Sequence, residues 1–168
     1  MQEGVFKDYG ENETNIFINR INLVAANTRN NGGRVIFVQH DGTKEQGLHP
    51  FTPGWEILPA LVKMETDVVV RKTMNDAFCR TDLNAIITNL NPEKLVITGW
   101  ATDYCVDSTV RSAVSLGHNV VIISDGHTLG KRPDLTTKQI IDHYNWTWQN
   151  LLCRDSSIEV ILSSEWCK

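Results

Sequence analysis

The stretch at residues 95–125, LVITGWATDYCVDSTVRSAVSLGHNVVIISD, decides the fold. A short apolar run at its start ends at Gly99, which is typical of a buried strand. A helix is expected to begin near Cys105 and to end at Gly117, because glycine readily takes the conformation that closes a helix. A second apolar strand follows at 120–123. The stretch therefore predicts a βαβ unit, and the apolar side of its helix carries Val106, Val110, Ala113 and Val114.

Cys105 lies where the first strand of this unit gives way to the helix. The amides at a helix N-terminus point outward and the helix dipole favours an anion, so a thiolate at this place is stabilised. This position favours a nucleophile. The alternative is a small buried core cysteine, which is the commoner role of an isolated Cys.

The composition is that of an ordinary globular protein. The chain has 168 residues, 41% of them apolar and 21% charged, with a formal net charge of −4. These values suit a single domain over 1–168 and give no reason to expect nucleic acid or an anionic membrane as a partner. The four cysteines show no metal-binding spacing and no secretory signal is recognisable, so we expect reduced thiols and a cytoplasmic protein.

Helical and strand patterns alternate along the chain. This alternation predicts an α/β fold, a three-layer α/β/α arrangement around a mostly parallel, doubly wound sheet. Residues 1–6 and the tail at 165–168 are expected to be irregular, and long loops are expected at 40–55 and 73–80. Besides the βαβ unit, we expect helices at 14–30, 56–61, 82–90 and 135–151 and strands at 34–39, 67–71 and 157–162.

In parallel sheets, ligands bind beyond the carboxyl ends of the strands. His40, Lys72, Trp100 and Asp125 each follow a predicted strand end, so we expect them to share one rim with Cys105. Lys72 at this rim is either a solvated lysine or a cation that holds the thiolate.

Other polar residues near the rim have simpler interpretations. His40, Asp41 and His49 do not provide three ligands with evident metal geometry, so no metal is expected. His127 is interpreted as a loop residue that bonds the backbone. Asp103 and Asp107 are interpreted as helix-capping residues. The aromatic residues at loops or strand ends either pack at the rim or make the pocket apolar; they are Trp55, Phe78, Trp100 and Tyr104.

Taken together, these residues resemble the isochorismatase-like cysteine hydrolase family, which includes nicotinamidases and N-carbamoylsarcosine amidase. The resemblance covers nearly the whole chain, and its most specific motif is V-I-T-G-W-A-T-D-Y-C-V at 96–106. The supporting motifs are M-Q-E-G-V-F at 1–6, V-I-F-V-Q-H-D-G at 35–42, P-G-W-E at 53–56, V-V-R-K at 69–72 and A-F at 77–78.

The resemblance implies the roles of the site residues. Cys105 would be the nucleophile and Lys72 the catalytic lysine. The peptide bond between Trp100 and Ala101 would be cis, and the amides of Ala101 and Cys105 would form an oxyanion hole. No cofactor is implied. The residues expected to contact a small-molecule substrate are His40, Phe78, Trp100 and Tyr104.

The departure from the family is at the start of the chain. The family has a central strand that ends in an aspartate directly before the residue matching Met1. Neither Glu3 nor Asp8 matches that aspartate. Loss of this strand predicts an apolar slot and unpaired strand edges. We therefore expect that the sequence is truncated at its start or that its start is mis-assigned.

The resemblance predicts a hydrolase of a small amide or related C–N bond that works through a thioester. Cys105 favours this reaction over vinyl-ether hydrolysis of isochorismate, and the spacing of His40, Asp41 and His49 argues against nicotinamidase proper. The alternatives are that vinyl-ether hydrolase, or a catalytically degenerate member that acts as a binding or scaffold protein. A homo-oligomer is expected from the resemblance and from Trp146, Trp148 and Trp166.

Overall fold

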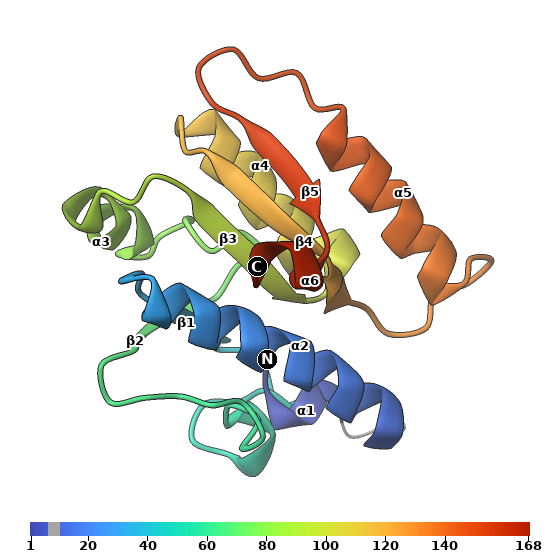
Figure 1. Cartoon of the computed structure of the whole chain (residues 1–168). Helices are drawn as coiled ribbons and strands as arrows, with labels where there is room; N and C mark the ends of the chain where they lie inside the picture. The colour runs from blue at the N-terminus through green and yellow to red at the C-terminus, as the bar shows by residue number, and fades with distance from the viewer. Residues whose placement is uncertain (7–10) are drawn as a thin grey trace.

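The strands in the described part of the chain form two separate parallel sheets (Figure 1). The computed structural model describes residues 1–6 and 11–168. One sheet pairs β1 (Ile36–His40) with β2 (Val68–Lys72). The other has the order β3-β4-β5, with its strands at Leu95–Trp100, Val120–Thr128 and Ile158–Ile161. The α/β class is confirmed.

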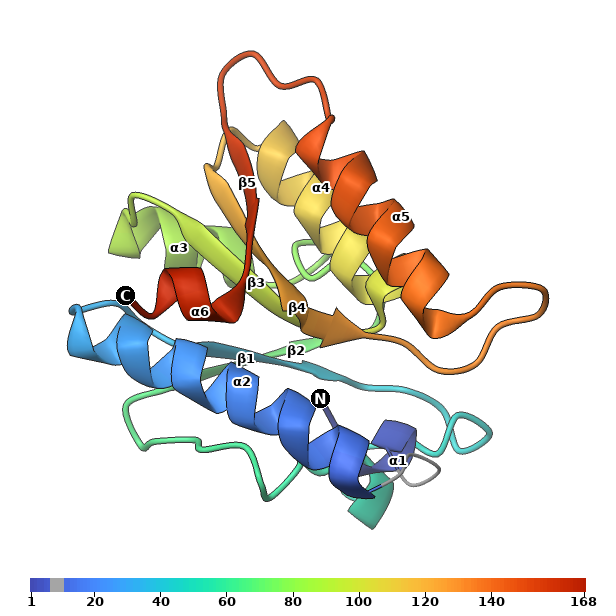
Figure 2. The same ribbon diagram turned by 45° about the vertical axis from the view of Figure 1, so that its right-hand side comes forward.

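Strand β4 is covered by helices on both faces, as a buried parallel strand requires. On one face, Val121 and Ile123 pack against Val24 of α2 (Glu11–Asn30) and against α6 (Ser163–Trp166). Because side chains alternate along a strand, Val120 and Ile122 point to the other face. There they pack with α4 (Asp107–Ser115) and α5 (Thr137–Gln149), which lie side by side in Figure 2 and are joined by the hydrogen bond from the Trp148 indole to the Asp107 carboxylate.

A helix that follows the smaller sheet in the sequence packs against it. Leu83 and Ile87 of α3 (Leu83–Leu90) are buried against Val70 of β2. The helix ends at Asn91, which has a left-handed φ of 45°. Pro92 follows, and a residue before proline rarely continues a helix. The expected helix at 82–90 is confirmed.

Three expectations for short segments are wrong. Residues Glu3–Phe6 form a short helix, α1, and Ser163–Trp166 form α6 in place of an irregular tail. No helix is present at 56–61, where Gln2 forms an antiparallel bridge with Ile57 and Pro59 lacks the N–H that a helix interior needs. A 3-10 turn, η1, lies just before, at Pro53–Trp55.

The three tryptophans of the C-terminal part have different environments. Trp148 is fully buried in the core, whereas Trp146 is 64% exposed. Trp166 packs against the cluster around Val121 and Ile123. Within the described ranges, none of the helices is long and apolar enough to cross a membrane.

Candidate active site

Cys105 lies in a tight turn between β3 and α4. The peptide bond between Trp100 and Ala101 is cis, which is the form that the resemblance implied. The next residues, Thr102–Val106, form a π-helical turn, η2, in which the Val106 N–H donates to the Ala101 carbonyl at 3.0 Å. The helical segment therefore begins before Cys105 and places the cysteine inside its first turn. Such π-turns are frequent at functional sites.

Asn75 connects the cysteine to the lysine. The Cys105 Sγ lies 3.8 Å from the Asn75 side-chain oxygen. The Lys72 ammonium donates to the backbone carbonyl of the same residue. Lys72 is the last residue of β2 and is only 6% exposed. Cys105 and Lys72, which are far apart in the sequence, thus share one neighbour.

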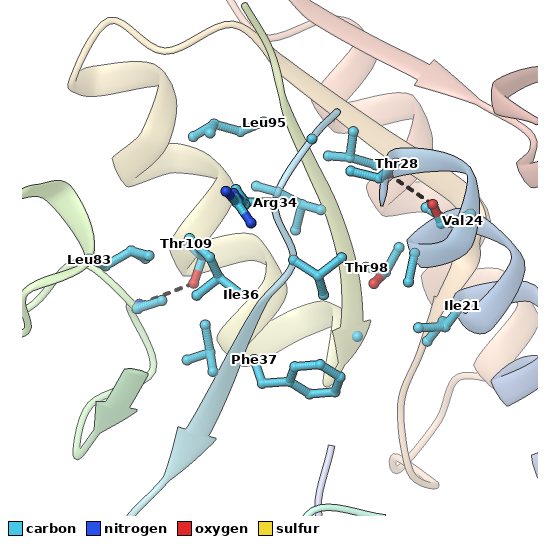
Figure 3. A pocket seen from close by; sticks show the side chains of 18 of the residues that line it. Ile21, Val24, Thr28, Arg34, Ile36, Phe37, Leu83, Leu95, Thr98 and Thr109 are labelled. Atoms are coloured by element: carbon cyan, nitrogen blue, oxygen red, sulfur yellow. Dashed lines mark hydrogen bonds between the residues drawn. The ribbon is translucent and has the colours of Figure 1, made fainter. Parts of the chain in front are cut away.

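The loop that carries Asn75 is held by α4. The Asp76 carboxylate accepts from the Ser112 hydroxyl at 2.7 Å, and the Ala77 N–H donates to the Thr109 hydroxyl at 3.1 Å, which is drawn in Figure 3. Sequence reasoning missed Asn75. The available signal was a polar residue soon after a strand-end lysine, but its contact with Cys105 depends on the packing of this loop against α4.

His40 lies beside Lys72, since the two residues are partners in the register of β1 and β2. Its ring is half-buried, and its Nδ1 has no hydrogen-bond partner in the described part of the chain. Burial lowers the pKa of His40, the charge of Lys72 acts in the same direction, and Asp41 opposes both. These effects favour the neutral form of the His40 ring at the site end of β1.

Met1 lies close to Lys72 and Cys105. Met1, Lys72, Trp100 and Cys105 line one end of a slot of about 490 Å³. The expectation of an apolar slot is confirmed, because most of the residues that line it are apolar and come from β1, β3, α2 and α3. Asp8 lies outside the described residues.

The aromatic candidates divide into two groups. Phe78 and Trp100 line the slot together with Cys105. Tyr104 is half exposed, and its ring packs against the Arg132 guanidinium at 4.8 Å from its centroid. Arg132 in turn donates to both carboxylate oxygens of Asp103, at 2.7 and 2.9 Å. Asp103 is therefore an ion-pair partner and not a helix cap.

Asp125 does not share the rim with Cys105. Its carboxylate accepts from the Ser163 backbone N–H at 2.8 Å and from the Ser163 hydroxyl at 2.9 Å. It also pairs with Arg20 at 3.3 Å. These contacts fasten α2 and α6 to β4, so the carboxylate has a structural role.

His127 is a buried residue of β4 and not a loop residue. Its ring nitrogens lie 2.9 Å from the hydroxyl of Thr102 and 2.9 Å from the side-chain oxygen of Asn145. Asp107 likewise departs from a capping role. It accepts from Arg111 at 2.9 Å and from the indole N–H of Trp148 at 2.9 Å.

The residues considered for a metal do not converge. Arg71 and the indole of Trp55 donate to the Asp41 carboxylate. Although burial acts in the opposite direction, these hydrogen bonds lower the pKa of Asp41. The His49 ring contacts its neighbouring carbonyl, that of Pro50. Across residues 1–6 and 11–168, no cluster of three His, Cys, Asp or Glu side chains could hold a metal ion.

Comparison with known proteins places the chain in a family. Residues 1–143 match the isochorismatase domain. Over 110 residues, 66% of this chain and 40% of the relative, the sequence is 34% identical to a streptothricin hydrolase of Streptomyces noursei. Over 80 residues, 46% of this chain and 32% of the relative, it is 35% identical to the ureidoacrylate amidohydrolase RutB of Variovorax paradoxus (strain S110).

A solved structure supports the same family assignment. The crystal structure of an isochorismatase family protein superposes with a TM-score of 0.76 at 30% identity, covering 85% of this chain and 82% of the other. The chain therefore belongs to the isochorismatase family, and its relatives include a streptothricin hydrolase and a ureidoacrylate amidohydrolase. The chain spans less than two thirds of the length of the two curated relatives named above.

Proposed function

We propose that this protein is a cysteine-dependent hydrolase of a small amide or related C–N bond. The observation that supports it most directly is the Asn75 contact, which places the Cys105 thiol and the buried Lys72 ammonium around one residue. The names of two relatives, a streptothricin hydrolase and a ureidoacrylate amidohydrolase, favour an amide or ureido substrate.

In the proposed reaction the Cys105 thiolate attacks the substrate carbonyl. A C–S bond forms, and the developing oxyanion is held by the backbone N–H groups of Ala101 and Cys105. The C–N bond then breaks and the amine leaves with the proton that the thiol gave up. Water hydrolyses the thioester, which returns the thiol and releases a carboxylic or carbamic acid.

Lys72 has an electrostatic role in this proposal. A cation near a thiol favours the thiolate and so lowers the free energy of the attacking form. The proton would be carried by the aspartate that the resemblance implies directly before Met1. Because Lys72 is buried, its charge acts in a medium of lower effective dielectric constant than water.

The test is ammonia release from a panel of small amides and ureido acids. The protein made from its native locus is compared with its Cys105→Ser and Cys153→Ser variants. We expect Cys105→Ser to lose activity and Cys153→Ser, a matched change at a cysteine outside the site, to keep it. Unchanged ammonia release by Cys105→Ser refutes the proposal. Cleavage of isochorismate by Cys105→Ala supports the vinyl-ether alternative.

We further infer that the protein works as a single domain in a reducing compartment such as the cytoplasm, and as a homo-oligomer. All four cysteines are free thiols in the structure. The exposed Trp146 on α5 is the candidate subunit contact. Light scattering of the wild type and of Trp146→Gln tests the oligomer, which the variant is expected to weaken.

A further inference from the structure

The loop that follows β4 starts beside the turn that carries Cys105. In the register of the sheet, Trp100 at the end of β3 is the partner of Thr128 at the end of β4. The next residue, Leu129, is buried and packs in one cluster with Ala101, which is also buried. The loop therefore leaves the sheet from a fixed point against the residue whose backbone N–H belongs to the proposed oxyanion hole.

Arg132 reaches from this loop to the turn. Its Nε and Nη2 donate to the two carboxylate oxygens of Asp103, at 2.7 and 2.9 Å. A bidentate contact of this kind fixes the orientation of the two groups as well as their distance. The guanidinium also lies 4.8 Å from the centroid of the Tyr104 ring, which is a cation–π contact. Arg132 therefore holds the two residues that directly precede Cys105.

The Arg132 guanidinium is also held by its own loop. Its Nη1 donates to the backbone carbonyl of Gly130 at 3.3 Å and to that of Lys131 at 3.2 Å. The side chains of Arg132 and Asp103 are only 20% and 14% exposed. Salt and water therefore screen this ion pair less than they screen a pair on the surface. These contacts make Arg132 a fixed connection between the loop and the turn.

Two other side chains near Cys105 are bonded to the C-terminal part of the chain. The Thr102 hydroxyl lies 2.9 Å from the Nδ1 of His127. The Asp107 carboxylate accepts from the Trp148 indole N–H at 2.9 Å. Both of these partners are buried in the core. Arg132 differs from them because it belongs to a loop and is partly exposed, so a change at Arg132 can alter the turn without removing a core side chain.

The thiol itself has a weaker connection to the rest of the site. The Cys105 Sγ lies 3.8 Å from the side-chain oxygen of Asn75, which is exposed. A thiol is a weak hydrogen-bond donor, so this contact does little to place the turn. A nucleophile reacts efficiently only when it is held at about 3–3.5 Å from the carbonyl, and a displacement of about 1 Å can cost about a hundredfold in rate. The position of the sulfur therefore depends on the side chains that hold its turn.

We propose that Arg132 is a positioning residue for Cys105, which holds the turn of the nucleophile through the Asp103 carboxylate and the Tyr104 ring. This role rests on the proposed function, in which Cys105 attacks the substrate carbonyl. A residue that only positions the nucleophile changes the rate of the chemical step and leaves substrate binding nearly unchanged. Arg132 and Asp103 act as one unit, because each side chain holds the turn only through the other.

The test measures kcat and KM for ammonia release by Arg132→Gln, with Arg111→Gln as the matched control. Arg111 also pairs with an aspartate, Asp107, at 2.9 Å. That aspartate follows Cys105 by two residues, as Asp103 precedes it by two. Both changes therefore remove a cation from an aspartate near the nucleophile, but only Arg132 joins the turn to another segment. We expect Arg132→Gln to lower kcat by about tenfold to a hundredfold with KM changed by less than about twofold, and Arg111→Gln to leave both nearly unchanged.

Further variants separate positioning from charge and from folding. Arg132→Lys keeps the charge but cannot form the bidentate contact, so we expect it to recover little of the lost rate. The double variant Arg132→Gln/Asp103→Asn should be no slower than Arg132→Gln, because both changes break one contact. If Arg132→Gln does not fold, Asp103→Asn weakens the same contact with a side chain of nearly the same size, and its kcat should fall while its KM stays.

Several outcomes contradict this proposal. A wild-type kcat in Arg132→Gln, an equal loss in Arg111→Gln, or full activity of Arg132→Lys shows that the bidentate contact does not position the turn. A loss confined to KM assigns Arg132 to substrate binding. A double variant much slower than Arg132→Gln shows that Arg132 does not act through Asp103.

Alkylation of Cys105 by iodoacetamide, measured by mass on the peptide that contains it, makes the test independent of the substrate. We expect Arg132→Gln to slow alkylation severalfold and Arg111→Gln to leave the rate unchanged, because only Arg132→Gln releases the turn and leaves the Asp103 carboxylate without its counter-ion. If the wild type hydrolyses no amide, the proposed function fails while slower alkylation of Arg132→Gln alone upholds the role of Arg132. Equal alkylation rates in the wild type and Arg132→Gln overturn that role, whether or not amides are hydrolysed.

Discussion

His127 is the centre of a buried hydrogen-bond chain that ties the Cys105 turn to α5. The Asn145 amide nitrogen donates to the Ser124 carbonyl at 3.1 Å, so its oxygen faces the Nε2 of His127. That oxygen only accepts, so Nε2 must carry the proton. Nδ1 is then unprotonated and accepts from the Thr102 hydroxyl. The neutral imidazole is the form that satisfies every partner.

The perturbation is His127→Phe, which keeps a ring against Trp148 but removes both hydrogen bonds. The His127 and Trp148 rings are 5.0 Å apart in an edge contact. The substitution leaves the buried Thr102 hydroxyl and the partly buried Asn145 oxygen without this partner. At about 1–3 kcal/mol for each unsatisfied group, the free energy of unfolding should fall by about 2–6 kcal/mol.

Urea unfolding at pH 7.5 measures this loss. The control is His143→Phe, the same change at an exposed position of α5, which should alter stability by less than about 0.5 kcal/mol. The double variant His127→Phe/Thr102→Val should recover part of the loss, because the hydroxyl that lacks a partner is gone. If His127→Phe is as stable as His143→Phe, the hydrogen-bond assignment is wrong.

The lowered pKa of His127 predicts that the free energy of unfolding depends on pH. Burial lowers the pKa of His127, although the Asn145 hydrogen bond and the charge of Asp125 oppose it. As the pH falls below about 6.5, the unfolded chain binds a proton that the folded chain does not, so stability falls. One such group contributes a slope of at most about 1.4 kcal/mol per pH unit. We expect His127→Phe to show a smaller slope than His143→Phe between pH 6.5 and 5; equal slopes contradict the account.

Three further predictions concern the candidate site and the C-terminal end of α2. Lys72→Gln should slow iodoacetamide alkylation of Cys105 at pH 7 severalfold, because it removes the buried cation that shares the neighbour Asn75 with the cysteine; an unchanged rate refutes this role. Asn75→Ala should reduce amide hydrolysis by about threefold to tenfold, the value of one hydrogen bond between neutral groups, because the Cys105 thiol loses the side-chain oxygen that accepts from it. Tm should not change, because Asn75 is exposed. Arg29→Met should lower the free energy of unfolding in urea by about 3–5 kcal/mol, because it leaves the buried Asp67 carboxylate without its bidentate partner; a loss below 1 kcal/mol, on the order of a surface pair, contradicts it.

The elements with strong local patterns could be predicted from the sequence. The alternating burial of β4 and the apolar side of α4 follow from the spacing of their valines and isoleucines. The end of α4 was predicted from Gly117, which has the expected left-handed φ of 85°. In each case the cause lies within a few residues of the effect.

The polar part of the fold could not be predicted in this way. Strand β4 continues to Thr128 through Asp125 and His127, whose partners are distant in the sequence. Buried polar groups are tolerated only where such partners exist. The sequence pattern shows their polarity but not the partners, so these residues were interpreted as a loop.

The candidate site likewise contains residues that local patterns reveal and a residue that they do not. Lys72 was predicted because it stands at the end of a strand, and Cys105 because it stands where a strand gives way to a helix; local patterns reveal both positions. Asn75, which lies between them, is in a loop whose course depends on Ser112 and Thr109 of α4. No periodic signal marks a loop residue that is positioned by tertiary contacts.

The proposed reaction requires a covalent thioester on Cys105 during C–N hydrolysis. Rapid acid quench followed by intact-mass measurement tests this claim directly, with the protein made from its native locus and an amide substrate that releases ammonia. We expect a mass increase equal to the acyl group, located on the peptide that contains Cys105 and absent from Cys105→Ser. Turnover in Cys105→Ser at the wild-type rate, with no adduct on either protein, contradicts the account.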